Sequence, residues 1–213
     1  MIKSKDEEII ESIKEKIRLE AEALNRVAEQ IDSACAEAVK LIMACRGRVI
    51  VTGLGKTGHI GGKIAASFAS LGIPAFFVHS CESLHGDMGM ITKDDVVIMI
   101  SNSGKSPEIL NMLTPLLIIG PKTISITNNR ESPLAKATDV AILCDGGGEI
   151  DFNSLAPTTS TTAALAIGDA LAAVISQEKG FSKNDFALSH PGGALGQTLM
   201  KEYMERVEKD SNA

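Results

Sequence analysis

Apolar residues near the start of the chain recur every three or four positions, which predicts a long amphipathic helix over residues 4–31. Charged residues occupy the opposite face, and a second helix is expected over residues 32–44. The narrow apolar stripe of the first helix could cover the core of its own chain or pack on a partner subunit. The spacing leaves both alternatives open.

After residue 47 the pattern changes to short apolar runs, which are typical of buried strands. These runs lie at residues 48–54, 73–78, 96–100, 123–127 and 140–143. Helical stretches between and after them are expected at residues 59–70, 107–119, 134–138, 161–177 and 194–207. The alternation predicts an α/β fold, a three-layer α/β/α arrangement with a mainly five-stranded parallel sheet preceded by N-terminal helices.

The 213 residues are enough to bury a single sizeable core, so we expect one structural domain overall. Within it, residues 1–47 form a helical arm and residues 48–213 form the sheet domain. The formal charge of −6 and an aromatic content of 3% argue against a nucleic-acid-binding protein, because that function requires a basic surface. A small anion would therefore have to be held by a local site.

The four cysteines lack a CxxC pair or a regular spacing, which indicates reduced thiols and a cytoplasmic protein. The charged start of the chain does not resemble a signal peptide. No uninterrupted apolar run approaches the roughly 18 residues of a membrane span. We expect neither export nor a membrane partner.

The segment that follows the first predicted strand, residues 53–58, has the glycine spacing of a dinucleotide-binding loop. A dinucleotide site also needs an acidic residue at the end of the second strand, where this chain has His79. A P-loop would need glycine at the position of Ile50. What remains is a glycine turn whose backbone amides can approach an anion, with Lys56 as a cation beside it or simply in solvent.

Hydroxyl groups are concentrated after the third predicted strand, in the segment Ser-Asn-Ser-Gly-Lys-Ser-Pro-Glu of residues 101–108. Ser106 suits a helix N-cap, Pro107 suits the first helical position, and Gly104 allows the backbone to turn tightly. Such a loop can bind a phosphate through hydroxyls, first-turn amides and the helix dipole. The alternative is that Ser106 only caps the helix and the other serines are ordinary loop residues.

Two carboxylates could transfer protons in such a site. Glu108 lies in the first turn of the expected helix, where its ordinary effect is to favour the helix dipole. Glu149 follows a run of three glycines after the fifth strand. The hydroxyl-rich segment around Thr158 should complete the pocket, and at least one of its side chains is expected to cap the following helix.

His190 stands in a Gly-Pro context before the last helix and could carry protons near neutral pH. His79, Cys81 and His85 have side chains of the type that bind metals, but their spacing is loose. We therefore expect no metal site, and these three residues remain weak candidates.

Taken with their flanking residues, these segments resemble the sugar isomerase (SIS) domain and, within it, the arabinose 5-phosphate isomerases of the Kdo pathway, which serves lipopolysaccharide or capsule synthesis. The resemblance covers residues 48–197 and includes GLGKTGHIG, LHGD, SNSG, APT and ALSHPGG. The serine motif is shared by all SIS domains, whereas the LHGD and LSHPGG segments are more selective. Relatives usually carry a pair of CBS domains after this region, and the sequence ends at Ala213, so we expect no regulation by such modules.

The resemblance implies an aldose-ketose isomerase that interconverts ribulose 5-phosphate and arabinose 5-phosphate through an enediol, without a cofactor. It also implies a homotetramer in which the catalytic histidine reaches a neighbouring subunit. The implied catalytic residues are Lys56, Glu108, Glu149 and His190, and it does not decide which glutamate is the base. The expected substrate- and phosphate-binding residues are Gly55, Thr57, His85, Ser101, Asn102, Ser103, Ser106 and Thr158. The alternatives are a non-catalytic sensor of sugar phosphates and an isomerase of a related ketose phosphate.

Overall fold

The computed structural model describes residues 4–211, so residues 1–3 of the expected arm and 212–213 of the expected domain lie outside it. Five parallel strands form one sheet in the order β2-β1-β3-β4-β5, which confirms the predicted α/β fold. The strands are β1 (Val49–Gly53), β2 (Ala75–His79), β3 (Val96–Ile100), β4 (Lys122–Thr127) and β5 (Val140–Leu143).

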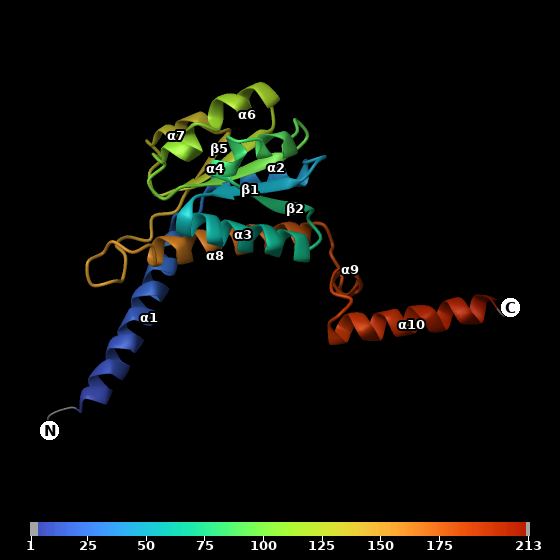
Figure 1. The fold of residues 1–213 in the computed structure, drawn as a ribbon. Helices are drawn as coiled ribbons and strands as arrows, with labels where there is room; N and C mark the ends of the chain where they lie inside the picture. Colours follow the sequence, from blue (N-terminus) through green and yellow to red (C-terminus); the bar gives the residue numbers. More distant parts are fainter. Residues whose placement is uncertain (1–3, 212–213) are drawn as a thin grey trace.

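Helices cover both faces of this sheet and give the three layers of the expected fold (Figure 1). The helices before β3 are α1 (Lys5–Glu29), α2 (Ser33–Met43), α3 (Gly55–Ser70), α4 (Ser80–Ser83) and the 3₁₀ helix η1 (Asp87–Met90). Those after it are α5 (Pro107–Leu110), α6 (Leu113–Ile119), α7 (Pro133–Ala137), α8 (Thr159–Glu178), α9 (Lys183–Ser189) and α10 (Ala194–Ser211).

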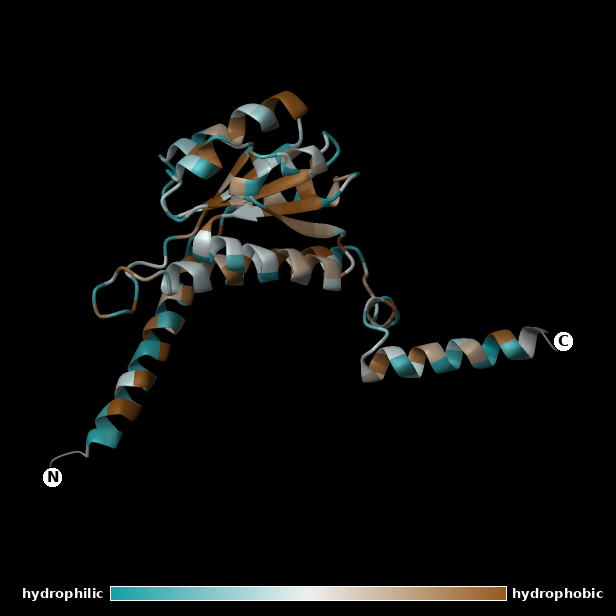
Figure 2. Ribbon diagram, viewed as in Figure 1, coloured by the Kyte–Doolittle hydropathy of each residue, from teal (hydrophilic) through white to brown (hydrophobic). Residues whose placement is uncertain are grey.

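The side chains of the central strands alternate between two apolar layers, as a sheet covered on both faces requires. Val49 and Val51 of β1 join one cluster with α2, α3 and α8. Ile50 of the same strand points to the other face, toward Met112 and Leu116 beside α6. Figure 2 shows the apolar strands at the centre of the body, enclosed by helices.

Several helices differ from the sequence-based prediction. The helix expected over residues 107–119 is broken into α5 and α6, because Pro115 has no amide hydrogen and its ring would clash with the carbonyl of Asn111 in a continuous helix. Helix α3 begins at Gly55, four residues earlier than expected. Its glycines allow close packing, since a Cβ at Gly61 would lie 3.0 Å from the ring of Phe77. The short helices α4, η1 and α9 were not predicted.

The two terminal helices leave the body in different directions (Figure 1). Helix α1 begins with a capping box formed by Ser4 and Glu7, and only its second half reaches the core, through Ala23 and Val27. Its first half exposes large apolar side chains, and the ribbon of the projecting helix carries brown, hydrophobic segments in Figure 2. These side chains are Ile9, Ile10, Ile13 and Ile17.

Helix α8 is the one helix in residues 4–211 that is long and apolar enough to cross a membrane by length and composition. However, 61% of its apolar window is buried inside the protein, where α8 contacts α1, α2 and α3. This burial is typical of a core helix.

Candidate active site

The point where the strand order reverses lies between β1 and β3, because the chain proceeds from β1 to β2 on one side and from β3 to β4 on the other. Ligands of open parallel sheets bind beyond the carboxyl ends of the strands at such a point. The two segments with candidate chemistry, residues 53–58 and 101–108, leave β1 and β3 at this edge. The topology thus brings both predicted loops together.

The serine loop after β3 has two of the features expected of an anion cradle, clustered hydroxyls and a tight turn. The hydroxyl oxygens of Ser101 and Ser106 lie 3.0 Å apart. Ser106 is the N-cap residue of α5, but its side chain makes no capping hydrogen bond, so its hydroxyl is directed to the loop instead. Gly104 adopts a φ of +63°, and a Cβ there would lie 2.1 Å from the hydroxyl oxygen of Ser132. The tight turn therefore requires glycine.

Neighbouring elements brace this loop. The carbonyl oxygen of Asn102 accepts hydrogen bonds from the amide of Asn128 and the hydroxyl of Thr127, each at 2.9 Å. The amide of Leu134, at the start of α7, donates to the carbonyl of Gly104 at 3.2 Å. The backbone is thus fixed from β4 and α7, while the side chains of Asn102 and Ser103 are exposed.

The glycine segment after β1 forms the first turn of α3. Thr57 stabilises this start, since its hydroxyl donates to the carbonyl of Leu54 at 2.8 Å and accepts from the amide of Leu54 at 3.2 Å. Lys56 is exposed beside it, and Gly55 adopts a φ of +56°. A small cavity of about 10 Å³ is lined by Thr57, Asn102 and Ser160, among others. Residues from three separate segments therefore converge at this edge of the sheet.

Glu149 caps helix α8, a contact that the sequence did not suggest. One carboxylate oxygen accepts from the amide and hydroxyl of Thr158, at 2.8 and 3.0 Å, and from the amide of Ser160 at 3.2 Å. The other oxygen accepts from the Ser160 hydroxyl. The expectation that a hydroxyl of this segment caps α8 is wrong, because the Thr158 side chain makes no cap hydrogen bond. A charged group at the positive end of the helix takes its place.

The charge of Glu149 is stabilised by these contacts. Partial desolvation by itself would raise the pKa of the Glu149 carboxyl, but the hydrogen bonds from Ser160 and Thr158 outweigh it and lower the pKa. The carboxylate is thus ionised at neutral pH, as a general base must be. Glu108, the other carboxylate, is half-buried in the first turn of α5.

His190 lies at the opposite end of the sheet from these loops. Its Nε2 is 2.9 Å from the hydroxyl of Ser70, the last residue of α3, and its Nδ1 is 2.9 Å from the carbonyl of Phe186, whose ring it stacks on. Helix α3 extends from Gly55 to Ser70, about 22 Å at 1.5 Å per residue. Within one chain, His190 and Lys56 are therefore too far apart to act on the same substrate.

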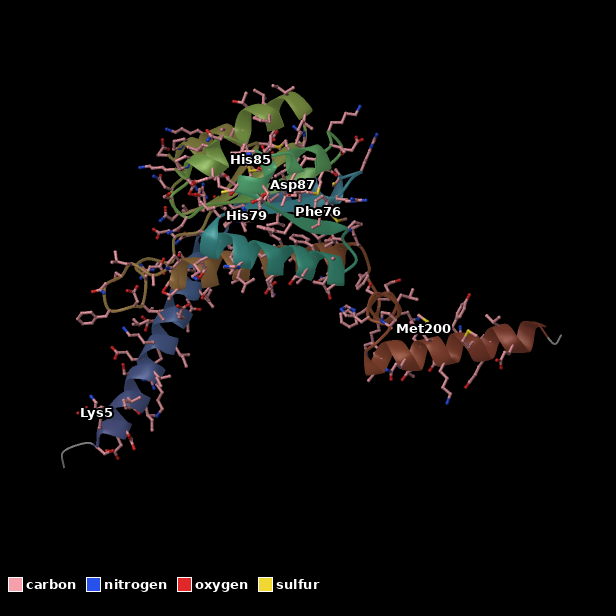
Figure 3. The ribbon with its side chains drawn as sticks, viewed as in Figure 1. Lys5, Phe76, His79, His85, Asp87 and Met200 are labelled. Atoms are coloured by element: carbon pink, nitrogen blue, oxygen red, sulfur yellow. The ribbon has the colours of Figure 1, made fainter. Side chains whose placement is uncertain are left out.

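His79 is the last residue of β2 and His85 follows α4, and both lie on the sheet body (Figure 3). His79 caps α4 by accepting a hydrogen bond from the Cys81 amide at 3.3 Å through Nδ1, whereas His85 is exposed. Within residues 4–211, no cluster of three or more His, Cys, Asp or Glu residues that could hold a metal ion is found. The three weak metal candidates are thus not assembled into a site.

Comparisons with known proteins identify the family of the chain. The family described as SIS domain matches residues 42–174, which is more than half of the chain. The chain belongs to the SIS domain family.

Relatives of this SIS chain are named for one reaction. The arabinose 5-phosphate isomerase KdsD of Pseudomonas aeruginosa is 49% identical over 197 residues, which cover 92% of this chain and 60% of that protein. The arabinose 5-phosphate isomerase KpsF of Escherichia coli O6:H1 is 44% identical over 206 residues, covering 96% of this chain and 63% of that protein. The SIS chain therefore spans about three fifths of the length of these relatives.

A solved structure of the E. coli CFT073 protein c3406, in complex with arabinose 5-phosphate, matches the SIS chain with a TM-score of 0.86. It is 42% identical in sequence, and the match covers 88% of this chain and 100% of that chain.

The SIS chain thus brings most of the predicted site residues to one edge of its sheet and separates His190 from them, whereas His85 is exposed in the turn that follows α4. The residues gathered on the loops after the strands or at the helices that begin there are Gly55, Lys56, Thr57, Ser101, Asn102, Ser103, Ser106, Glu108, Glu149 and Thr158. His190 is at the other edge. Ser160 was missed by the sequence analysis, although its place in the hydroxyl-rich run after Pro157 was a usable signal.

Proposed function

We propose that the chain interconverts D-ribulose 5-phosphate and D-arabinose 5-phosphate through an enediol intermediate and supplies Kdo biosynthesis. The observation that carries this proposal is that the whole c3406 chain, whose structure is a complex with arabinose 5-phosphate, aligns with this one. The names of the curated relatives agree with it. The serine cradle supplies a site for a phosphate in a chain whose net charge of −6 would otherwise repel it.

Isomerisation requires ring opening, removal of a proton from the carbon beside the carbonyl and its return to the adjacent carbon. In our proposal the phosphate binds the serine loop of residues 101–106. Lys56 stabilises the negative charge of the enediolate, and Glu149 or Glu108 moves the carbon-bound proton. His190 opens the ring or relays a proton.

The contacts of Glu149 bear on its role as base. Its carboxylate is ionised, which favours proton abstraction, but its hydrogen bonds at the start of α8 also stabilise the charge and weaken it as a base. A base in this position would have to exchange some of these contacts for the substrate. Glu108 lies in the first turn of the short helix α5 and makes no comparable capping hydrogen bonds there. Both carboxylates therefore remain candidates for the base.

We also propose a homotetramer with shared active sites in the cytoplasm. The separation of about 22 Å along α3 supports sharing, because His190 could then serve the pocket of a neighbouring subunit. The exposed isoleucines of α1 would be covered in such an assembly. We retain the division into an arm, residues 1–47, and an SIS domain, residues 48–213, as part of this proposal.

The test is incubation of the purified chain with ribulose 5-phosphate in deuterated water. We expect arabinose 5-phosphate with deuterium at its second carbon, since an exposed base exchanges its proton. Product without deuterium would indicate a shielded transfer or a hydride shift. No product, with binding of ribulose 5-phosphate intact, would refute the enzyme and favour a sugar-phosphate sensor, and turnover of a different ketose phosphate would favour the related isomerase.

Glu149→Gln and Glu108→Gln identify the base. Loss of a general base lowers the rate by about 100- to 10,000-fold. We expect a loss in this range for one variant, with ribulose 5-phosphate binding retained. Glu178→Gln, at the far end of α8, is a matched control that should change the rate by less than about twofold. A loss below tenfold in both site variants would contradict the assignment.

A further inference from the structure

The glycine segment that leads to Glu149 is held by the N-terminal helix. Gln30, at the C-terminal end of α1, binds both backbone groups of Asp145, which follows β5. Its side-chain amide nitrogen donates to the Asp145 carbonyl at 2.8 Å, and its side-chain oxygen accepts from the Asp145 amide at 3.0 Å. One side chain therefore fixes the position where the chain leaves the sheet.

The segment after Asp145 consists of glycines, which have no side chains that could fix its conformation. Three consecutive glycines, residues 146–148, separate Asp145 from Glu149, and glycine has the largest backbone freedom to lose on folding. An aspartate turn restrains one of them, since the amide of Gly147 donates to the carboxylate of Asp145 at 3.0 Å. The remaining restraints come from other elements.

Helix α1 supplies contacts on this segment beyond those of Gln30. A Cβ at Gly146 would lie 3.1 Å from the Thr159 methyl and 3.5 Å from the Cβ of Ala23, so this glycine is packed between α8 and α1. A Cβ at Gly147 would lie 3.4 Å from a guanidinium nitrogen of Arg26. The segment thus runs through a junction of α1 and the start of α8, directly before Glu149 binds the first turn of α8.

We propose that Gln30 is a positioning residue for the reaction, which holds the glycine segment so that the Glu149 carboxylate meets the first turn of α8. This inference rests on the proposed function and on Glu149 being, of its two candidate carboxylates, the one that acts on the substrate. Gln30 itself touches neither of the two loops expected to bind phosphate, so its effect should fall on the chemical step rather than on phosphate binding. In this way the N-terminal helix becomes part of the site.

The experiment compares Gln30→Ala with Asn25→Ala, a substitution of an exposed polar residue on the same helix. Displacement of a reacting group by about 1 Å lowers rates by about 100-fold. For Gln30→Ala we expect kcat to fall about 10- to 100-fold, while the KM for ribulose 5-phosphate changes by less than about threefold. Asn25→Ala should leave both within about twofold of the wild type.

Amide hydrogen exchange of residues 145–150 supplies a second readout that needs no turnover. We expect exchange there to accelerate by about tenfold or more in Gln30→Ala and to stay unchanged in Asn25→Ala. If Gln30→Ala does not fold, Gln30→Glu replaces it, because its carboxylate can still accept from the Asp145 amide but cannot donate to the carbonyl. The expected loss in kcat is then smaller, with the same pattern of exchange.

An unchanged kcat, or a loss that follows a lower melting temperature while exchange of residues 145–150 is unaltered, would overturn the inference. A wild-type chain without isomerase activity would instead refute the proposed function. The exchange rates would still decide whether Gln30 holds the segment, so the two failures can be told apart.

Discussion

Ser160→Ala tests how Glu149 is held at the start of α8. Ser160 is only 9% exposed, and its hydroxyl donates to the Glu149 carboxylate. A hydrogen bond to a charged group contributes about 1.5–3 kcal/mol, whereas one between neutral groups contributes about 0.5–1.5 kcal/mol. Alanine removes one oxygen atom without a large cavity. We therefore expect the free energy of unfolding at pH 7 to fall by about 1.5–3 kcal/mol.

The loss should depend on pH in a defined direction. Hydrogen bonding lowers the pKa of Glu149 in the folded chain from its ordinary value of 4.5, so the stability it contributes is present above that value and is lost as the pH falls through the folded pKa. Removing the Ser160 hydroxyl moves the folded pKa back toward the unfolded one. The difference between wild type and variant should therefore be smaller at pH 3 than at pH 7.

The assay is urea-induced unfolding at both pH values and a fixed protein concentration. Thr161→Val is the matched control, because Thr161 is also buried in the first turns of α8 and its hydroxyl donates at 2.9 Å to the neutral carbonyl of Thr158. Its loss of stability should be the same at both pH values. A loss for Ser160→Ala that does not change with pH would refute the view that its main partner is an ionised carboxylate. If Glu149 is the base, the acidic limb of the rate profile should also move to higher pH in Ser160→Ala.

Three further predictions follow from the same contacts. Gly104→Ala should raise the KM for ribulose 5-phosphate at least about tenfold, because a side chain there meets Ser132 and requires a strained φ of +63°, and an unchanged KM in steady-state kinetics would contradict the serine cradle. Asp95→Ala should lower the free energy of unfolding by about 2–4 kcal/mol, since its buried carboxylate accepts from two backbone amides, and a loss below about 1 kcal/mol in urea titration would be inconsistent with this role. His190→Ala and the glutamate variant that lowers the rate, Glu149→Gln or Glu108→Gln, should each be nearly inactive alone. A mixture of the two that is unfolded and reassembled together should regain activity, whereas a mixture as inactive as its components would argue against shared sites.

The pattern of apolar residues by itself determined the layers of this fold. The runs that became β1 and β3 carry apolar residues on both faces, so they could be stable only as inner strands covered by helices. The glycine and serine segments could be assigned to the ligand-binding edge because parallel strands all end at the same side. At Pro115 the steric restriction of proline outweighed the apolar pattern, and the expected helix is divided into α5 and α6.

Tertiary structure decided the partners of the polar groups. Glu149 and Ser160 are eleven residues apart, and no spacing rule shows that the carboxylate would cap the helix in place of a hydroxyl. Gln30 and Asp145 are 115 residues apart, and they meet only because α1 packs on α8 beside β5. The position of His190 beside Ser70 depends likewise on how α9 returns to α3. Sequence periodicity indicates which face of a helix or strand is buried. Contacts between polar side chains that are distant in the sequence depend instead on how whole helices and strands pack together, and this packing is seen only in the folded chain.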